Sequence, residues 1–247
     1  MSRLYAAELL KLRTLRSTWG FAAVMLLFAG LVTAGNIGGS TDEDRFDPEL
    51  QSRIALDVAF PASILALLLG IILVTNEFRH GTIARTLLAT PRRGRFVIVK
   101  LVTGASVGAV FVVASLVVAF VTSAIWLGVL DVPLELPEWG DGVWRALVAT
   151  TLAGLFGAAI GGVVHSQVGA LVGVLVWMFV LEPICWVLLA LVDLDGVSEY
   201  LPAASLGGTV DSEGEGMSWL TSVAVASGWA ALAAVLAFVR TNRRDVT

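Results

Sequence analysis

The chain has 247 residues, of which 57% are hydrophobic, with a mean hydropathy of +0.86 and a formal net charge of −4. Soluble domains hold about 45–50% apolar residues, so this composition excludes a water-soluble protein and indicates an integral membrane protein. The single cysteine, Cys185, excludes an intrachain disulfide, and no cluster of Cys and His residues offers a metal site.

Six stretches are long and apolar enough to cross a bilayer, which takes about 20 mostly apolar residues. They are residues 18–37, 55–75, 103–128, 144–164, 168–192 and 218–239. The sequence therefore predicts an all-α membrane protein with six transmembrane helices in a single domain, 1–247.

The chain opens with a basic segment, about residues 3–17, ahead of the first span. Its apolar residues recur at helical spacing, and its basic residues lie largely on other faces. The apolar set is Tyr5, Leu9 and Leu12, continued by Trp19. This pattern predicts a helix in the cytoplasmic interface of the membrane. Two alternatives stay open: an ordinary basic flank to the first span, or a signal peptide cleaved near residues 32–35.

Several connections are predicted from composition. Residues 38–54 are strongly acidic and predict a short solvated connection. The apolar run 96–130 is longer than one crossing needs, so we expect a long tilted helix whose first turns lie among the headgroups. His165-Ser166-Gln167 is the polar point for a tight turn between the fourth and fifth spans. A re-entrant or interfacial element within 193–217 requires that protein covers its backbone.

Residues 76–100, NEFRHGTIARTLLATPRRGRFVIVK, are a basic interruption between the second and third spans. Gly81-Thr82 can start a short cytoplasmic helix, which ends before Pro91. One face of that helix is apolar and needs lipid or a partner protein; it carries Ile83, Leu87 and Leu88. The following basic residues are expected to anchor the segment at the membrane surface, because three Arg at mid-bilayer would cost about 8–10 kcal/mol. These anchors are Arg92, Arg93, Arg95 and Lys100.

The third span contains Gly104-Ala105-Ser106-Val107-Gly108, which matches the nucleophile motif G-x-S-x-G. One hypothesis is an intramembrane protease with Ser106 as nucleophile and His165 as base. The motif needs a strand-to-helix turn, however, and here it lies within an apolar helix. Glycines four residues apart favour close helix packing instead, and the same spacing recurs at Gly157/Gly161 and Gly169/Gly173.

Glu182 is the one acidic residue deep inside a span, and Pro183 beside it permits a kink. It is either a proton or cation site, or a neutral, hydrogen-bonded carboxylic acid that faces another helix. In both cases we expect Glu182 to line a helix interface.

The charges are sorted along the chain. Thirteen of the 16 Lys and Arg residues lie in 3–16, 79–100 and 240–244, which alternating helices place on one side. The opposite segments, 42–57, 131–141 and 193–215, hold sixteen of the 20 acidic residues. Loops rich in Lys and Arg stay in the cytoplasm, so both termini are expected there, in a protein of the cell membrane. Basic residues that serve as topology anchors give no indication of nucleic-acid binding.

The order Glu77, Gly81-Thr82, Leu87-Leu88, Pro91, Arg92-Arg93 and Lys100 resembles the signature loop of permease subunits of ABC-2-type transporters. The basic segment Glu8-Leu9-Leu10-Lys11-Leu12-Arg13 and the six-span layout are similar to that family too. Many members have Ser shortly after the proline, where this chain has Arg92-Arg93.

The resemblance implies a coupling helix that docks in a groove of a separate ATPase subunit. It assigns coupling to Glu77, Arg79, His80, Gly81, Thr82, Ile83, Arg85, Leu87 and Leu88. The chain would pair with a second permease copy or paralogue and export an amphipathic small molecule, peptide or lipid. No G-x-x-x-x-G-K-[ST] motif occurs in the sequence, so ATP and Mg would be bound by the partner ATPase.

Three alternatives to this reading stay open. The loop can lie on the membrane with its arginines among lipid phosphates. The chain can be a proton-coupled secondary transporter that uses Glu182. It can also be a membrane sensor or scaffold that transports nothing.

Overall fold

The computed structural model describes residues 2–14, 16–79, 81, 93–137, 139–210 and 217–242, and the regular structure in these ranges is helical. Six helices are long and apolar enough to cross a membrane. They are Arg16–Gly39, Pro48–Arg79, Gly94–Val129, Trp139–Val164, Gln167–Ala190 and Trp219–Thr241. The predicted all-α fold with six such helices is confirmed.

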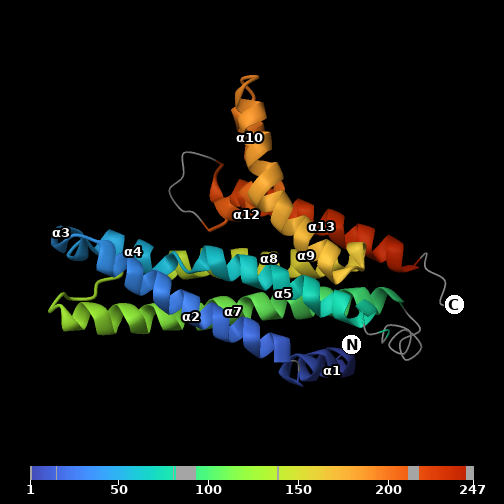
Figure 1. The fold of residues 1–247 in the computed structure, drawn as a ribbon, viewed down its shortest axis with the longest axis horizontal. Coiled ribbons are helices and arrows are strands. Elements are labelled where there is room, and N and C mark those ends of the chain that lie inside the picture. The colour runs from blue at the N-terminus through green and yellow to red at the C-terminus, as the bar shows by residue number, and fades with distance from the viewer. Residues whose placement is uncertain are drawn as a thin grey trace.

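The elements follow one another as α1 (Ser2–Thr14), α2 (Arg16–Gly39), α3 (Asp42–Arg45), α4 (Pro48–Leu56), α5 (Ala59–Arg79), α7 (Arg93–Val129), α8 (Trp139–Val164), α9 (Gln167–Val176), the π-helical segment η1 (Trp177–Leu181), α10 (Glu182–Ala190), α11 (Asp195–Ser198), α12 (Pro202–Gly208) and α13 (Trp219–Asn242). Figure 1 shows α2, α5, α7, α8 and α13 side by side along the length of the molecule. The helix α1 lies at one end of this bundle, and α3 and α4 lie at the other.

Helix α8 packs closely against both α5 and α7. A Cβ atom at Gly157 would overlap the carbonyl group of Leu67 in α5, and one at Gly108 of α7 would overlap the carbonyl group of Thr150. Small residues let helix backbones approach one another in a membrane, where packing rather than water exclusion drives association. The packing role predicted for the first two Gly-x-x-x-Gly pairs is therefore confirmed. Gly173, from the third pair, has no atom within 4 Å of its Cβ position.

The acidic connection 38–54 differs from the expectation, because it forms helices instead of an irregular loop. Thr41 starts α3 with a capping box, and the Asp47 side chain accepts backbone N–H bonds at the start of α4. Gln51 of α4 is buried, and its Nε2 donates to the Pro133 carbonyl at 3.1 Å. This bond ties the connection to the segment that follows α7.

The length of α7 and the turn between α8 and α9 agree with the predictions made from the sequence. Helix α7 has 37 residues, or about 55 Å at about 1.5 Å per residue, which exceeds the roughly 30 Å hydrocarbon layer. The tight turn between α8 and α9 falls at the predicted tripeptide. His165 there has a φ of 59°, and the Ser166 side chain caps α9 by accepting from the Gly169 N–H at 3.2 Å.

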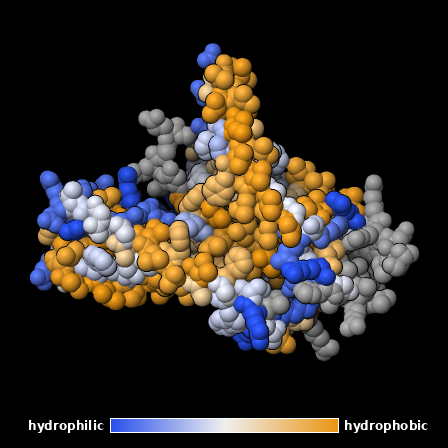
Figure 2. Space-filling view, viewed as in Figure 1, coloured by the Kyte–Doolittle hydropathy of each residue, from blue (hydrophilic) through white to orange (hydrophobic). Residues whose placement is uncertain are grey.

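The fifth long helix is interrupted and leans away from the bundle. Its middle turn, η1, is π-helical, with the Glu182 N–H donating to the Trp177 carbonyl. Pro183 follows and has no N–H to continue the α-helical pattern. Figure 1 shows α10 projecting from the body, and Figure 2 shows that most of the projection below its hydrophilic tip is apolar. Only 6% of the apolar window of Gln167–Ala190 is buried, so this helix presents an apolar surface to its surroundings.

Candidate functional site

Four charged side chains meet where α1 crosses the end of α5 and the start of α7. They are Glu8, Lys11, Glu77 and Lys100, here called the ion cluster. The Lys100 ammonium lies 2.5 Å from Glu8 Oε2 and 2.7 Å from Glu77 Oε1. The Lys11 ammonium lies 2.7 Å from Glu8 Oε1 and 2.8 Å from Glu77 Oε1. Each carboxylate therefore contacts both lysines.

Three of the four residues of the ion cluster are buried. Glu8 is 5% exposed, Glu77 6% and Lys100 3%, whereas the Lys11 side chain is 46% exposed. Two ammonium groups balance two carboxylates, so burial leaves no net charge in the cluster. Burial alone would lower the pKa of Lys11, but the hydrogen bonds and charges of Glu77 and Glu8 outweigh it and raise that pKa.

The helix α1 reaches the ion cluster because its apolar side packs on the bundle. Glu8 and Lys11 are three residues apart and so share one face, while Leu12 is buried in an apolar cluster that also includes Leu69 and Leu73 of α5. The position of this helix in the cytoplasmic interface of the membrane stays a prediction. Leu10, on another side of α1, remains 62% exposed.

The residues assigned to ATPase coupling lie partly within the described ranges. Glu77 belongs to the ion cluster. Arg79 is exposed, and its guanidinium donates to Gln167 Oε1 at 3.2 Å. Gly81 has a φ of 64°, and its N–H donates to the Phe78 carbonyl at 3.3 Å, so it terminates α5. The remaining residues, His80, Thr82, Ile83, Arg85, Leu87 and Leu88, lie outside the described residues.

The residues expected to anchor the chain at the membrane surface lie in different environments in the structure. Arg95 is exposed in the first turn of α7, and Arg93 is the first residue of that helix. Arg92 lies outside the described residues. Lys100 differs from the surface position expected of it, because its ammonium is enclosed by the ion cluster and lies 5.6 Å from the Phe96 ring centroid.

Ser106 and His165 make separate contacts. The G-x-S-x-G sequence lies in the middle of α7 without a turn, so it lacks the geometry of a nucleophile elbow. The Ser106 hydroxyl is 2.7 Å from the Tyr5 hydroxyl of α1 and donates to the Val102 carbonyl at 2.8 Å. The His165 ring contacts the Phe78 ring in a tilted arrangement, with ring centroids 4.2 Å apart. Ser106 thus contributes to the attachment of α1.

Glu182 is fully buried at the junction of η1 and α10. Its Oε2 accepts from Trp177 Nε1 at 2.5 Å and from the Ala203 N–H at 3.0 Å, and its Oε1 accepts from the Ala204 N–H at 2.5 Å. The last two donors belong to the first turn of α12, whose N–H groups have no partner within the helix. Glu182 therefore fixes α12 against the fifth long helix. A proton carrier needs access to water on each side in turn, which full burial and three donors oppose.

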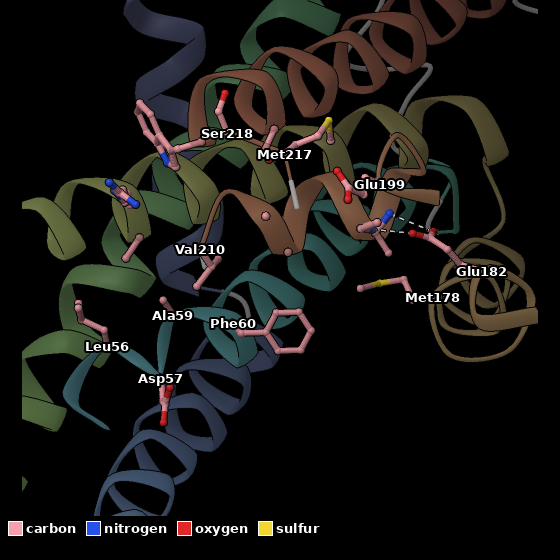
Figure 3. A pocket seen from close by; sticks show the side chains of 18 of the residues that line it. Leu56, Asp57, Ala59, Phe60, Met178, Glu182, Glu199, Val210, Met217 and Ser218 are labelled. Carbon is pink, nitrogen blue, oxygen red and sulfur yellow. Dashed lines mark hydrogen bonds between the residues drawn. The ribbon is translucent and has the colours of Figure 1, made fainter. Parts of the chain in front are cut away.

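A cavity of about 960 Å³ lies beside Glu182. Helices α4, α5, α8, α10, α12 and α13 contribute residues to its walls. Figure 3 shows Met178 and Glu199 near Glu182 at one end, with Leu56 and Val210 toward the other end. Phe60 projects from α5 between them. Sequence reasoning missed this cavity, because folding alone brings its walls together, from Arg53 in α4 to Ser222 in α13.

The ion cluster was also missed as a unit, although one signal was present in the sequence. Lys100 follows four residues of which three are β-branched and one is aromatic, and an ammonium within such a run needs a partner. That partner, Glu8, is 92 residues away. No protein-family model matches the sequence, and a search of curated proteins returns no match. The likeness to ABC-2-type permeases therefore rests on the residues of the 76–100 segment and on the helix layout.

Proposed function

We propose that this chain is the transmembrane permease subunit of an ATP-driven exporter of the ABC-2 type. It moves an amphipathic small molecule, peptide or lipid out of the cytoplasm or the inner leaflet, and a separate P-loop ATPase binds ATP and Mg. The observation that carries the proposal is the ion cluster, which joins α1 to both helices that flank the basic interruption.

The ion cluster gives a displacement of this interruption a route into the bundle. Glu77 lies two residues before the end of α5, and Lys100 lies at the start of the third turn of α7. Glu77 is paired with Lys11 of α1, and Lys100 is paired with Glu8 of α1. A displacement of one of these three helices would therefore move the other two. Helix α5 in turn packs against α8 through glycine contacts. Closure of the ATPase would push this unit and switch the spans between inward-open and outward-open states.

The charge pattern supports the orientation of the proposed permease. Figure 1 shows α1, the end of α5 and the end of α13 at one end of the bundle, where the sequence is basic. The acidic helices α3 and α4 lie at the other end. Positive residues favour the cytoplasm, so we place both termini there in the cell membrane. The apolar surface of α9 and α10 suits lipid and a second permease copy or paralogue.

Co-purification tests the ATPase partnership. The chain, tagged and solubilised from its native membranes, is expected to carry a P-loop ATPase with it. The double variant Leu87→Asp/Leu88→Asp should insert normally and lose that subunit. Val129→Asp/Leu130→Asp is the matched control, because Val129 ends α7, Leu130 follows it, and the two are 78% and 39% exposed. Equal ATPase recovery with both double variants would reject the proposed docking face.

A further inference from the structure

Among the residues that the structure describes, five charged ones line the cavity beside Glu182: Arg53, Asp57, Arg145, Glu182 and Glu199. Protein groups engage the first four. Asp57 accepts a hydrogen bond from Asn36 Nδ2 at 2.8 Å, and the Arg145 guanidinium lies 5.9 Å from the Trp219 ring centroid. Glu182 holds the first turn of α12, and Arg53 also interacts with a neighbouring protein group.

Glu199 is the exception. It is half-buried in the cavity wall, and within the described part of the chain its carboxylate has no hydrogen-bond or ion-pair partner. A carboxylate in a partly desolvated site attracts positive charge more strongly than one in open water. The five charged residues also sum to −1, with two guanidinium groups against three carboxylates. The charge left for a ligand to neutralise is therefore negative.

Apolar and polarizable side chains line the same cavity. Phe60 is 46% exposed, Phe179 59% and Trp186 45%, and all three contribute to its walls together with Met178 and Met217. Aromatic faces attract cations within about 6 Å of the ring centroid. Methionine side chains adapt to ligands of different shape. The cavity therefore combines one available carboxylate with a flexible, aromatic apolar wall.

We propose that this cavity binds a lipophilic cation, whose positive group pairs with Glu199 and whose apolar part lies against Phe60, Phe179 and Trp186. At about 960 Å³ the cavity is large enough for a drug-sized molecule. The proposal names the cargo class of the exporter proposed above and rests on that function for its role in transport. Binding itself needs no ATPase, so the two claims fail separately.

Direct binding tests the proposal. Radiolabelled tetraphenylphosphonium is titrated onto the full chain, purified without any ATPase in a neutral detergent, and counts from empty micelles are subtracted. We expect saturable binding that Glu199→Gln weakens about tenfold or more. Asp193→Asn is the matched control, because this acidic residue belongs to the same connection and does not line the cavity; it should bind as the unsubstituted chain does.

A second variant guards against a general loss of structure. Trp186→Leu keeps an apolar residue at an exposed position and is expected to weaken binding about three- to tenfold through loss of the cation–π contact. Thermal unfolding of both variants should match that of the unsubstituted chain. The proposal is overturned if tetraphenylphosphonium does not bind saturably, or if Glu199→Gln binds it equally well. It is also overturned if the lipophilic anion tetraphenylborate binds more tightly, which would assign the cavity to Arg53 and Arg145.

Discussion

Lys100 of α7 and Glu8 of α1 form an ion pair across 92 residues of sequence, with 2.5 Å between Nζ and Oε2. Both are almost fully buried. Buried charges persist only when they are paired and hydrogen-bonded, and here Glu77 and Lys11 complete the set. This relationship explains why a helix as short as α1 stays attached to the bundle.

The first prediction concerns the two lysines of the ion cluster. Lys100→Met leaves two buried carboxylates with one ammonium between them, and should lower the free energy of unfolding by about 3–5 kcal/mol. Lys11→Met removes an ammonium that is 46% exposed and should cost clearly less, because solvent screens that charge. Thermal unfolding in detergent compares the two variants. Equal losses, or a larger loss for Lys11→Met, would show that burial does not set the strength of these pairs.

The second prediction concerns pH. The folded-state pKa of Lys11 is raised above 10.5, so the stability that its charge contributes is complete below that value. It is lost only as the pH rises through the raised pKa. Lys11→Met should therefore differ from the unsubstituted chain by a constant amount between neutral and mildly alkaline pH. The difference should shrink above 10.5. Thermal unfolding across this range checks the prediction, and a difference that shrinks at neutral pH would contradict the assigned partners.

The third prediction compares two glycines of the same motif spacing. A Cβ at Gly157 would overlap the Leu67 carbonyl, whereas one at Gly173 would meet no atom within 4 Å. Gly157→Ala should force α8 and α5 apart and cost about 1–3 kcal/mol. Gly173→Ala should be neutral or stabilise by up to about 1 kcal/mol through helix propensity. The same unfolding assay decides, and a tolerated alanine at Gly157 would mean that this helix contact is looser than described.

The fourth prediction concerns Glu182. Its two oxygens accept N–H bonds from Ala203 and Ala204 separately, so a glutamine must turn its own NH₂ group toward one of these donors. Glu182→Gln should lower stability by about 1–3 kcal/mol and release α12 for proteolysis. Trp177→Phe removes a single donor and should cost about 0.5–1.5 kcal/mol. Protease resistance of Glu182→Gln equal to that of the unsubstituted chain would rule out the anchoring role.

Local patterns in the sequence predict the long helices well. Apolar runs of sufficient length identify six of them, and the polar residues at 165–167 identify the turn between α8 and α9, because bilayer thickness and backbone hydrogen bonding constrain both. The caps of α3 and α4 are also written locally, as Thr41-x-x-Asp44 and Asp47-Pro48. The acidic composition of residues 38–54 nevertheless favours a solvated loop, so the sequence analysis does not predict these two helices.

Contacts between distant segments escape such patterns. Lys100 looks like a surface anchor beside Arg95, and only the arrival of α1 supplies the carboxylate that permits its burial. Glu182 is recognisable as an intramembrane acid, yet two of its three donors belong to α12, more than 20 residues later. The cavity needs the tilt of the fifth long helix, and helix tilt follows from packing rather than from hydropathy.

ATP hydrolysis by the purified complex tests the central claim most directly. The chain is isolated from native membranes through its own tag, and phosphate release is measured per mole of chain for the unsubstituted protein and for Leu87→Asp/Leu88→Asp. The account predicts hydrolysis that co-elutes with the unsubstituted chain and disappears with the double variant, while Val129→Asp/Leu130→Asp retains it. Hydrolysis at the same level in both double variants, or none with the unsubstituted chain, would contradict the account.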